Sequence, residues 1–504
     1  MSDERVKPAS VFLGRVLPTI LHWLVPLLFL VYTTLRAVFL SITHDEAGSF
    51  AIWTHFNIFT CRTNPDCWGS ANLHWLYVFL MKGSVGLFGG PEWAIRLPAL
   101  LGHVIYLFFS VKLVKWLVGP DMPGRPWLVL LGILLLNFNP YLLEFFGLAR
   151  GYGLAVAMML ASVYYFARWT VTERRADLGG CFFGAFLAVM SNFTLLSYVA
   201  CLCAVAGGIA LVDYFQKKEN KWRLLADVAG MAAVCGAVLY WLLRFPVSTL
   251  RKMGEFEYGA GGFGDTLNSI VRTSLYGVRY IKMYNLELFG GLMAVLLMAA
   301  AFLSVRDFAK KPGDAGRRFF LAAVLLPVLI GLATIVQHHL LGSQYLVNRT
   351  ALLFLPLLAL PVFLLAVRLL RSKKRGWGAV LAIVLGLFCT VHVLRAGQLQ
   401  FTSEWAYDFQ TRDMLEYLKE KLPPGKKIKL GVHWLYHPSG SYYLKTGRFG
   451  FTAEPLTYAK DLRLDGHYDY YYVQPSDMEA LQDHYVLEKP FAWVGCLMRR
   501  KMEE

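Results

Sequence analysis

About eleven long apolar runs follow one another along this 504-residue chain, and they constrain its fold more than any other feature. A helix needs about 20 apolar residues to cross a hydrocarbon core of roughly 30 Å. Only 17% of the residues are charged, whereas a soluble globular protein has about 25%. We therefore expect an α-helical polytopic membrane protein with about eleven transmembrane helices. The runs lie near 16–36, 96–117, 127–146, 152–168, 178–195, 196–215, 224–243, 286–305, 319–341, 350–370 and 378–396.

Basic residues indicate how these helices are oriented. The net charge of +16 is first a topology signal in a membrane protein, so it does not favour nucleic acid as a partner. If the N-terminus is cytoplasmic, dense Lys and Arg clusters such as 217–223, 306–318 and 368–375 all fall on the inner side. The loop at 42–95 and the C-terminal segment then lie outside. The first run precedes "SITHDE" rather than a small-residue cleavage site, so we expect no cleavable signal peptide.

The chain divides into a transmembrane domain, 1–397, and a soluble extracytoplasmic domain, 398–504. In the long first outer loop, 42–95, the apolar segments 48–59 and 72–88 are expected to form helices at the membrane interface. A true span at 72–88 is the alternative, but it would move the basic clusters outside. In the C-terminal domain, "TRDMLEYLKEKL" predicts a helix, and "IKLGVHW", "YDYYYVQP" and "WVGCLMRR" predict strands of a small α/β fold.

Three further features of the chain leave alternatives open. The glycine-rich "EFEYGAGGFGD" in the loop at 245–285 is either a substrate-gated lid or an ordinary flexible connector. The polar "MSNFT" at 190–194, between two apolar runs, could form a re-entrant turn. Cys61 and Cys67 share the first outer loop, where they form either a small disulfide or two free thiols.

Two adjacent acids, Asp45 and Glu46, come directly after the first apolar run. A carboxylate near hydrocarbon costs several kcal/mol unless it lines a polar cavity, so acids at the end of a span are functional candidates. One carboxylate can take a proton from an acceptor hydroxyl, and its neighbour can orient the reacting groups. Alternatively, the pair neutralises Arg36 or caps a short interfacial helix.

Arginines at the predicted outer helix ends are candidates for holding an anion. Arg150, Arg349 and Arg96 all occupy such positions. The planar guanidinium can bind phosphate oxygens in pairs, which suits it to this role better than lysine. The alternative for each is simple anchoring at the membrane interface.

Histidines and one tyrosine complete the candidate site. His44 adjoins the two acids, His74 lies further along the same loop, and Tyr152 follows Arg150, where it could stack on a ligand. Acids with several outer histidines, including the pair His338-His339, could bind a divalent metal. No tight spacing such as HExxH occurs, so we expect no metal site, and no cofactor is firmly implied.

Four segments in order give the chain a resemblance to a known group. Asp45-Glu46 follows the first span, "NLHWLYVFLMKGSVGLFGGPEWAIRLPALL" spans 72–101, "GLARGYGLAVAMML" spans 147–160 and "QYLVNRTALLFLPLLAL" spans 344–360. Together they resemble the GT-C fold glycosyltransferases that use polyprenyl-phosphate sugars, the protein O-mannosyltransferase, aminoarabinose transferase and Rgt-type family. The resemblance covers about residues 10–395. The family often has His-Pro-Pro where this chain has His74-Trp75-Leu76.

The resemblance implies an integral-membrane glycosyltransferase that moves a sugar from a polyprenyl-phosphate carrier to a hydroxyl of a lipid, glycan or protein on the outer face. It implies inversion at the sugar C1, with Asp45 as the base and Glu46 as its partner. Arg150 and Arg349 would hold the carrier phosphate. A bacterial inner membrane is the expected location. A flippase or transporter for a lipid-linked sugar, or a non-catalytic binding protein, is the alternative; a transporter would favour charges near mid-span and repeated halves.

Overall fold

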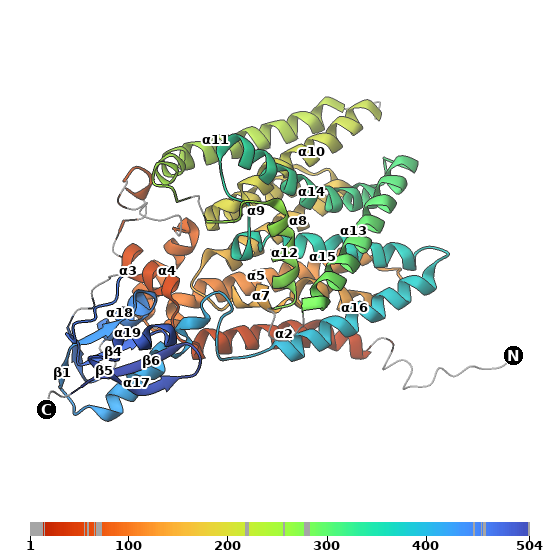
Figure 1. Cartoon of the computed structure of the whole chain (residues 1–504). Coiled ribbons are helices and arrows are strands. Elements are labelled where there is room, and N and C mark those ends of the chain that lie inside the picture. Colours follow the sequence, from red (N-terminus) through yellow and green to blue (C-terminus); the bar gives the residue numbers. More distant parts are fainter. Residues whose placement is uncertain are drawn as a thin grey trace, which may run out of the picture.

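The structure is a computed structural model in which a helical bundle carries a small mixed region of helices and strands at one end (Figure 1). In the described part of the chain, eight helices are long and apolar enough to cross a membrane, by length and composition. This confirms the predicted polytopic membrane protein. The structure describes residues 14, 16–54, 56–57, 60–64, 66, 73–216, 221–255, 258–276, 283–446, 449–454, 456 and 460–501.

The eleven predicted apolar runs are all helical, but they form two groups by length. Eight have a helix of full spanning length: α2 (Leu17–Phe39), α5 (Glu92–Val118), α8 (Gly151–Thr172), α10 (Leu196–Gln216), α11 (Lys221–Lys252), α13 (Met283–Lys310), α14 (Ala315–Leu341) and α16 (Arg375–Ala396). The other three have shorter helices: α6 (Arg125–Asn137), α9 (Arg175–Ser191) and α15 (Phe354–Leu370).

Local signals shorten two of these three helices. The run at 127–146 is interrupted where Asn139 accepts a hydrogen bond from the backbone of Leu142 and Pro140 starts a new helix, α7 (Pro140–Glu144). Proline suits a first helical position, because its missing N–H would have no partner there. The run at 350–370 begins with a 3₁₀ turn, η5 (Asn348–Ala351), before α15.

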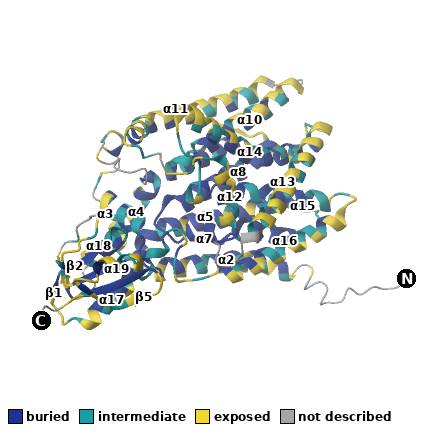
Figure 2. Cartoon of the chain, in the orientation of Figure 1, coloured by how far each residue is buried: buried dark blue, intermediate teal, exposed yellow. Residues whose placement is uncertain are grey.

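Burial separates the centre of the bundle from its surface. Helices α5, α7 and α8 are largely buried (Figure 2). The outer helices α13 and α16 instead expose large apolar side chains, among them Leu292, Phe302, Leu387 and Leu394. Apolar surface on this scale is unfavourable in water, and in a bilayer it faces lipid. The burial pattern therefore agrees with an integral membrane protein.

Two helices occupy the long loop at 42–95. They are α3 (His44–Trp53) and α4 (Trp75–Phe88), at the end of the bundle that carries the strands (Figure 1). The first begins four residues before the predicted segment 48–59, because Thr43 acts as its N-cap. Cys61, in the 3₁₀ turn η2 (Thr60–Arg62), is disulfide-bonded. The prediction for Cys67 falls outside the described residues.

The C-terminal region contains the predicted helix α17 (Thr411–Lys421), a second helix α18 (His437–Lys445) and a four-stranded sheet. The sheet order is β2-β4-β6-β5, with β2 (Leu430–Val432) parallel to β4 (Tyr470–Val473) and the other neighbours antiparallel. The predicted third strand is β6 (Gly495–Arg500). Sequence reasoning missed β5 (Tyr485–Phe491), an edge strand with a bulge and a proline, which weakens a strand pattern. The remaining short elements are β1 (Lys427–Ile428), β3 (Thr452–Ala453), α19 (Met478–Leu481) and the turns η6 (Ala406–Gln410), η7 (Trp434–Tyr436) and η8 (Pro475–Asp477).

Tyrosines of α18 attach this region to the turn between α2 and α3. The backbone N–H of Ile42 donates to the Tyr443 hydroxyl at 2.8 Å, and the Ser41 hydroxyl lies 3.1 Å from the same oxygen. The neighbouring Tyr442 donates to the carbonyl of Gly90 at 2.5 Å. The C-terminal region therefore packs directly over the segment that contains Asp45 and Glu46.

A buried ion pair fixes the connection from α16 into the C-terminal region. Arg36 donates to Glu144 at 2.7 Å, and both side chains are almost fully buried. The same guanidinium donates to the carbonyls of Gln398 and Phe401, and Ser403 donates to Glu144. The alternative that Asp45-Glu46 neutralises Arg36 is therefore wrong, because Glu144 does so.

The loop at 245–285 contains a helix, α12 (Phe263–Ser274). Before the helix, the backbone of Ala260 pairs with that of Tyr345 in an isolated bridge. After it, the Tyr276 hydroxyl donates to Glu144 at 2.7 Å. Contacts on both sides of α12 thus attach this segment to the bundle.

Candidate active site

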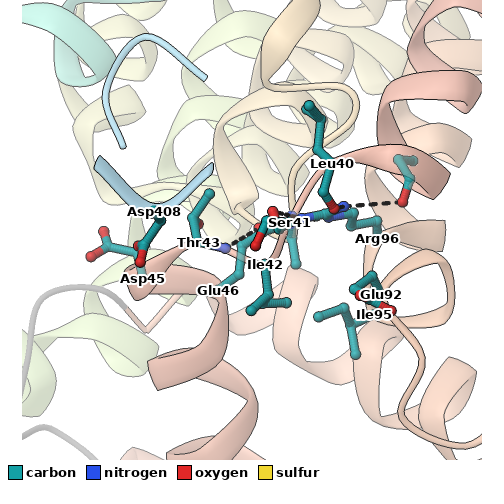
Figure 3. Close-up of polar contacts among 12 residues, drawn as sticks. Leu40, Ser41, Ile42, Thr43, Asp45, Glu46, Glu92, Ile95, Arg96 and Asp408 are labelled. Carbon is teal, nitrogen blue, oxygen red and sulfur yellow. Dashed lines mark hydrogen bonds and ion pairs between the residues drawn. The ribbon is translucent and has the colours of Figure 1, made fainter. Parts of the chain in front are cut away.

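The two acids belong to the first turn of α3. The backbone N–H of Thr43, the N-cap residue, donates to the Glu46 carboxylate at 3.0 Å, forming half of a capping box. Adjacent residues on a helix are about 100° apart, so they face different surroundings. Figure 3 shows this divergence: Glu46 points toward Arg96, whereas Asp45 lies beside Asp408.

Glu46 is fully buried and its oxygens are occupied. Arg96 donates to Oε1 at 2.8 Å and to Oε2 at 2.7 Å, in a bidentate pair. The backbone N–H groups of Ala149 and Thr43 donate one further hydrogen bond to each oxygen. Burial alone would raise the pKa of Glu46, but the charge and hydrogen bonds of Arg96 hold it below the ordinary value. Glu46 is therefore an ionised structural anchor for the turn.

Arg96 has no N–H left for a ligand. Besides its two hydrogen bonds to Glu46, it donates to the carbonyls of Ala37, Leu40 and Ser41 at 2.9 to 3.1 Å (Figure 3). A guanidinium has five N–H donors, and these contacts use all of them. The structure thus places Arg96, predicted as a phosphate ligand, at the end of α2, where it holds the backbone that leads into α3.

Asp45 lies between two arginines. Its Oδ2 is 3.3 Å from Nη2 of Arg150 and 4.0 Å from Nη2 of Arg349. The Asp45 side chain is 13% exposed, more than that of Glu46 or Arg150. The structure therefore brings together the predicted base and both predicted phosphate-binding arginines, from three segments far apart in sequence.

Arg150 is the N-cap residue of α8 and is completely buried. One of its nitrogens donates to the Ser49 hydroxyl at 2.9 Å and contacts the backbone oxygen of Asp45. The guanidinium also lies 5.9 Å from the ring centre of Tyr152. Residues of α3 therefore orient the Arg150 side chain, which projects from the start of α8.

Arg349, the second arginine beside Asp45, belongs to η5. It donates to Oε2 of Glu404 at 2.9 Å and to the Tyr258 hydroxyl at 3.2 Å. Its guanidinium lies 4.1 Å from the ring centre of Tyr258 and 5.4 Å from that of Trp405. Aromatic faces of this kind attract and orient a cation.

His74, the N-cap residue of α4, lies beside the arginines. Its ring contacts that of Tyr152 edge to face at a centroid distance of 5.0 Å. Burial, followed by the charges of Arg150 and Arg349, holds the pKa of His74 well below its ordinary value. The imidazole is therefore neutral near pH 7.

The remaining histidines have other neighbours. The Nδ1 atom of His44 lies 2.9 Å from the carbonyl of Leu435, so His44 joins α3 to the C-terminal region. His338 makes a similar contact with Ser343 at the end of α14. Among the described residues, no three His, Cys, Asp or Glu side chains are grouped closely enough to hold a metal ion.

Sequence reasoning missed the acids that the C-terminal region contributes. Glu404 accepts hydrogen bonds from Arg349 and from the Tyr141 hydroxyl. Asp408 is buried and accepts from the backbone N–H of His44 at 2.5 Å. The signal was weak: the stretch "SEWAYDF" is rich in acids and aromatic residues, directly after the last apolar run.

Asp408 is also a second carboxyl group beside the predicted base (Figure 3). The hydroxyls of Ser439 and Thr411 donate to its Oδ1. Burial raises the pKa of Asp408 to about 8, the nearby charge of Asp45 adds to the effect, and the hydrogen bonds oppose it. Asp408 is therefore largely protonated at pH 7, which limits the negative charge next to Asp45.

Several buried polar atoms at this site accept or donate no hydrogen bond within the described part of the chain. They are Asp45 Oδ2, His74 Nε2, Asn192 Nδ2 and Arg349 Nε. Native proteins leave few such atoms, because each costs about 1–3 kcal/mol. Other such atoms lie elsewhere in the described residues, but Asp45, His74 and Arg349 are neighbours. Their free donors and acceptors are available to one polar ligand at this site.

Comparisons with protein-family models and with curated proteins give no match to this sequence. Among solved structures, the chain resembles ArnT from Cupriavidus metallidurans in the apo state, with a TM-score of 0.56 and 13% identity over 95% of this chain and 97% of that chain. The same protein bound to undecaprenyl phosphate gives a TM-score of 0.54 with equal identity and coverage. AglB from Archaeoglobus fulgidus, in complex with an inhibitory peptide and a dolichol-phosphate, gives 0.49 at 12% identity, over 95% and 74% of the two chains.

The similarity to ArnT extends over almost the whole of both chains, so it includes the C-terminal region as well as the bundle. At 13% identity the similarity establishes the fold alone, and the chemistry has to be inferred from the residues of this chain. The fold that the sequence resemblance implied is thereby confirmed: this chain has the GT-C fold of the aminoarabinose transferase ArnT.

Proposed function

We propose that this protein is an integral-membrane glycosyltransferase. It moves a sugar from a polyprenyl-phosphate carrier to a hydroxyl acceptor, on the side of the membrane where α3, α4 and the C-terminal region lie. We take this to be the outer face, because the basic clusters fall on the other side. The ArnT structure with bound undecaprenyl phosphate supports the class of donor, through the shared fold.

One observation carries the proposal: the Asp45 carboxylate lies within ion-pair distance of both Arg150 and Arg349. Two guanidinium groups at one point form a suitable site for a phosphate, which they can bind through paired hydrogen bonds. A carboxylate at the same point is next to the bond that must break. Base and leaving group are therefore in reach of one sugar C1.

The reaction assigns a task to each group. The acceptor oxygen attacks C1 of the sugar as its proton passes to Asp45. The C1–O bond to the carrier breaks, and its electron pair remains on the phosphate oxygen, where Arg150 and Arg349 stabilise the charge. Attack from the face opposite the phosphate inverts C1.

Glu46 and Arg96 have a different part in this proposal. Neither can reach a substrate, because their donors and acceptors are already used within the protein. They fix the turn from which Asp45 projects, so we assign them as positioning residues rather than as the catalytic partner and phosphate ligand expected from the sequence.

The test uses purified protein in nanodiscs with a panel of polyprenyl-phosphate sugars and a membrane extract as acceptor. Carrier release is followed for the wild type, for Asp45→Asn and for a matched control, Asp66→Asn, which changes an exposed acid of the same loop. We expect release from one donor, its loss in Asp45→Asn with donor binding retained, and no change in the control.

Other outcomes would overturn parts of the proposal. Equal release by Asp45→Asn and wild type would remove Asp45 as the base. Tight binding of a donor without release, together with transfer of that lipid between leaflets, would favour a flippase. Binding with neither release nor transfer would favour a non-catalytic binding protein.

A further inference from the structure

The end of α9 meets the start of α8 beside Arg150. A Cβ atom at Gly151 would lie 2.1 Å from the carbonyl oxygen of Ser191 and 2.6 Å from Cβ of His74. Such distances are far inside van der Waals contact, so only glycine allows the three segments to meet here. Ser191, in the polar interruption at 190–194, therefore packs against the same glycine as His74, and Asn192 follows it directly.

That residue, Asn192, is buried and firmly oriented. Its Oδ1 accepts hydrogen bonds from the backbone N–H and the hydroxyl of Thr194, both at 3.0 Å. Because a backbone N–H can only donate, these contacts assign the amide oxygen and leave Nδ2 on the other side. Nδ2 has no partner among the described residues.

His74 presents the complementary group. Its ring is hydrogen-bonded to the backbone of Ser191, while Nε2 has no partner in the described part of the chain. A neutral imidazole has one donor and one acceptor nitrogen. Since the contact with Ser191 is to its carbonyl, Nε2 is the acceptor. His74, which is hydrogen-bonded to Ser191, thus carries a buried acceptor, and Asn192, the residue after Ser191, carries a buried donor.

We propose that His74 and Asn192 form a subsite for the hydroxyl groups of the transferred sugar, and that this subsite disfavours sugars with an ammonium group. A hydroxyl can donate to His74 Nε2 while another accepts from Asn192 Nδ2. The inference rests on the proposed function, because Arg150, which precedes Gly151, would hold the phosphate that is attached to the sugar.

Electrostatics supplies the selectivity against cations. Gly151 packs against His74 and directly follows Arg150, which is completely buried. An ammonium group bound at His74 would therefore lie close to a buried guanidinium, and like charges repel. Uncharged hydroxyls meet no such penalty. The Tyr152 ring, which contacts the ring of His74, offers an aromatic face to the sugar. The preferred donor is therefore a polyprenyl-phosphate sugar that carries hydroxyls and no amino group.

The experiment measures dissociation constants in nanodiscs for the bare polyprenyl phosphate, for the same carrier with a neutral hexose, and for the carrier with an amino sugar. We expect wild type to bind the carrier with the neutral hexose (the neutral donor) more tightly than the carrier with the amino sugar (the amino donor). Asn192→Ala should weaken the neutral donor about tenfold and change the bare carrier less than twofold. Asn268→Ala, at an exposed position of α12, is the matched control.

The three ligands separate failure of this inference from failure of the proposed function. If wild type binds neither the bare carrier nor the carrier with a sugar, the proposed function is wrong. If the bare carrier and the carrier with the neutral hexose both bind, but Asn192→Ala leaves the ratio of their dissociation constants unchanged, buried water satisfies Nδ2 and the subsite is wrong. Equal or tighter binding of the carrier with the amino sugar would also contradict the subsite. Should Asn192→Ala fail to fold, the pair His74→Gln and His74→Leu gives the same test, since only glutamine supplies an acceptor.

Discussion

The two faces of the first turn of α3 each pair an acid with arginine, but they differ in how completely the hydrogen bonds of these groups are satisfied. On one face, Glu46 and Arg96 are fully buried, and every donor and acceptor has a partner inside the protein. On the other face, Asp45 contacts Arg150 and Arg349 at 3.3 and 4.0 Å, and its Oδ2 accepts no hydrogen bond from the described residues.

The difference shows how a structural ion pair can be told from a binding site when charges and location are similar. A buried pair is stable only if all its groups are satisfied, because an unsatisfied charge in the interior is costly. A site that awaits a ligand must keep some groups incompletely satisfied. By this criterion the Glu46 face stabilises the fold, and the Asp45 face is the one to which we assign the proposed chemistry.

The comparison is tested most strongly by Asp45→Asn. This change keeps the shape of the side chain and removes its ability to take a proton. We expect transfer to fall by about 10²–10⁴-fold, as is usual when a general base is lost, with a smaller loss of stability than Glu46→Gln causes, because the Asp45 side chain is partly exposed. A variant that retained turnover, or that unfolded at much lower temperature, would contradict the assignment of this face.

The converse change is Glu46→Gln. It leaves Arg96 buried with an uncompensated charge, so we expect a loss of about 3–5 kcal/mol in stability. The measurement is thermal and denaturant unfolding in detergent. The double variant Glu46→Leu with Arg96→Met should recover much of that loss, because it removes both charges together. If the double variant were no better than the single one, the pair would not be the anchor described above.

A smaller effect is expected from Arg349→Lys. Lysine keeps the charge but loses the planar fork that binds two phosphate oxygens. We expect the dissociation constant for bare polyprenyl phosphate to rise about tenfold. Arg375→Lys, an exposed arginine at the start of α16, should leave binding unchanged. Equal binding by Arg349→Lys would show that the phosphate lies elsewhere.

Much of this architecture could be predicted from periodicity. The apolar runs are helices, and the acids do start a helix beside Arg150 and Arg349. These features depend on local pattern or on the position of a residue at a helix end, both of which a sequence displays. The strand at 485–491 was not predicted, because a bulge and a proline break the alternation of apolar and polar residues along it.

The roles of individual charges could not be predicted, because they depend on pairings across hundreds of residues. Arg36 pairs with Glu144 rather than with Asp45 or Glu46. Arg349 meets Glu404, which lies in the predicted soluble domain. Whether a guanidinium has a donor left for a ligand is a property of the packed structure, and a single sequence carries no record of it.

The last prediction concerns the pH dependence that Asp408 gives to stability; this residue joins the start of α3 to the C-terminal region through the His44 N–H. Its pKa is about 8 in the folded protein, above the ordinary value of 3.8, so the unfolded chain ionises first as pH rises. Its contribution to stability is therefore greatest below about pH 4, falls between pH 4 and 8 by at most about 1.4 kcal/mol per pH unit, and levels off above pH 8. Asp408→Asn keeps an acceptor for the His44 N–H and cannot ionise.

Thermal unfolding between pH 5 and 9 measures this contribution in the intact protein. The wild type should lose stability with rising pH more steeply than Asp408→Asn, and the two curves should become parallel above pH 8. Asp469→Asn, which changes an acid of the same C-terminal region whose carboxylate accepts from the Lys429 N–H, is the control and should follow the wild type. Parallel curves over the whole range would mean that Asp408 is ionised in the folded state. The C-terminal region would then hold a second negative charge beside Asp45, and the contrast between the two faces would need another explanation.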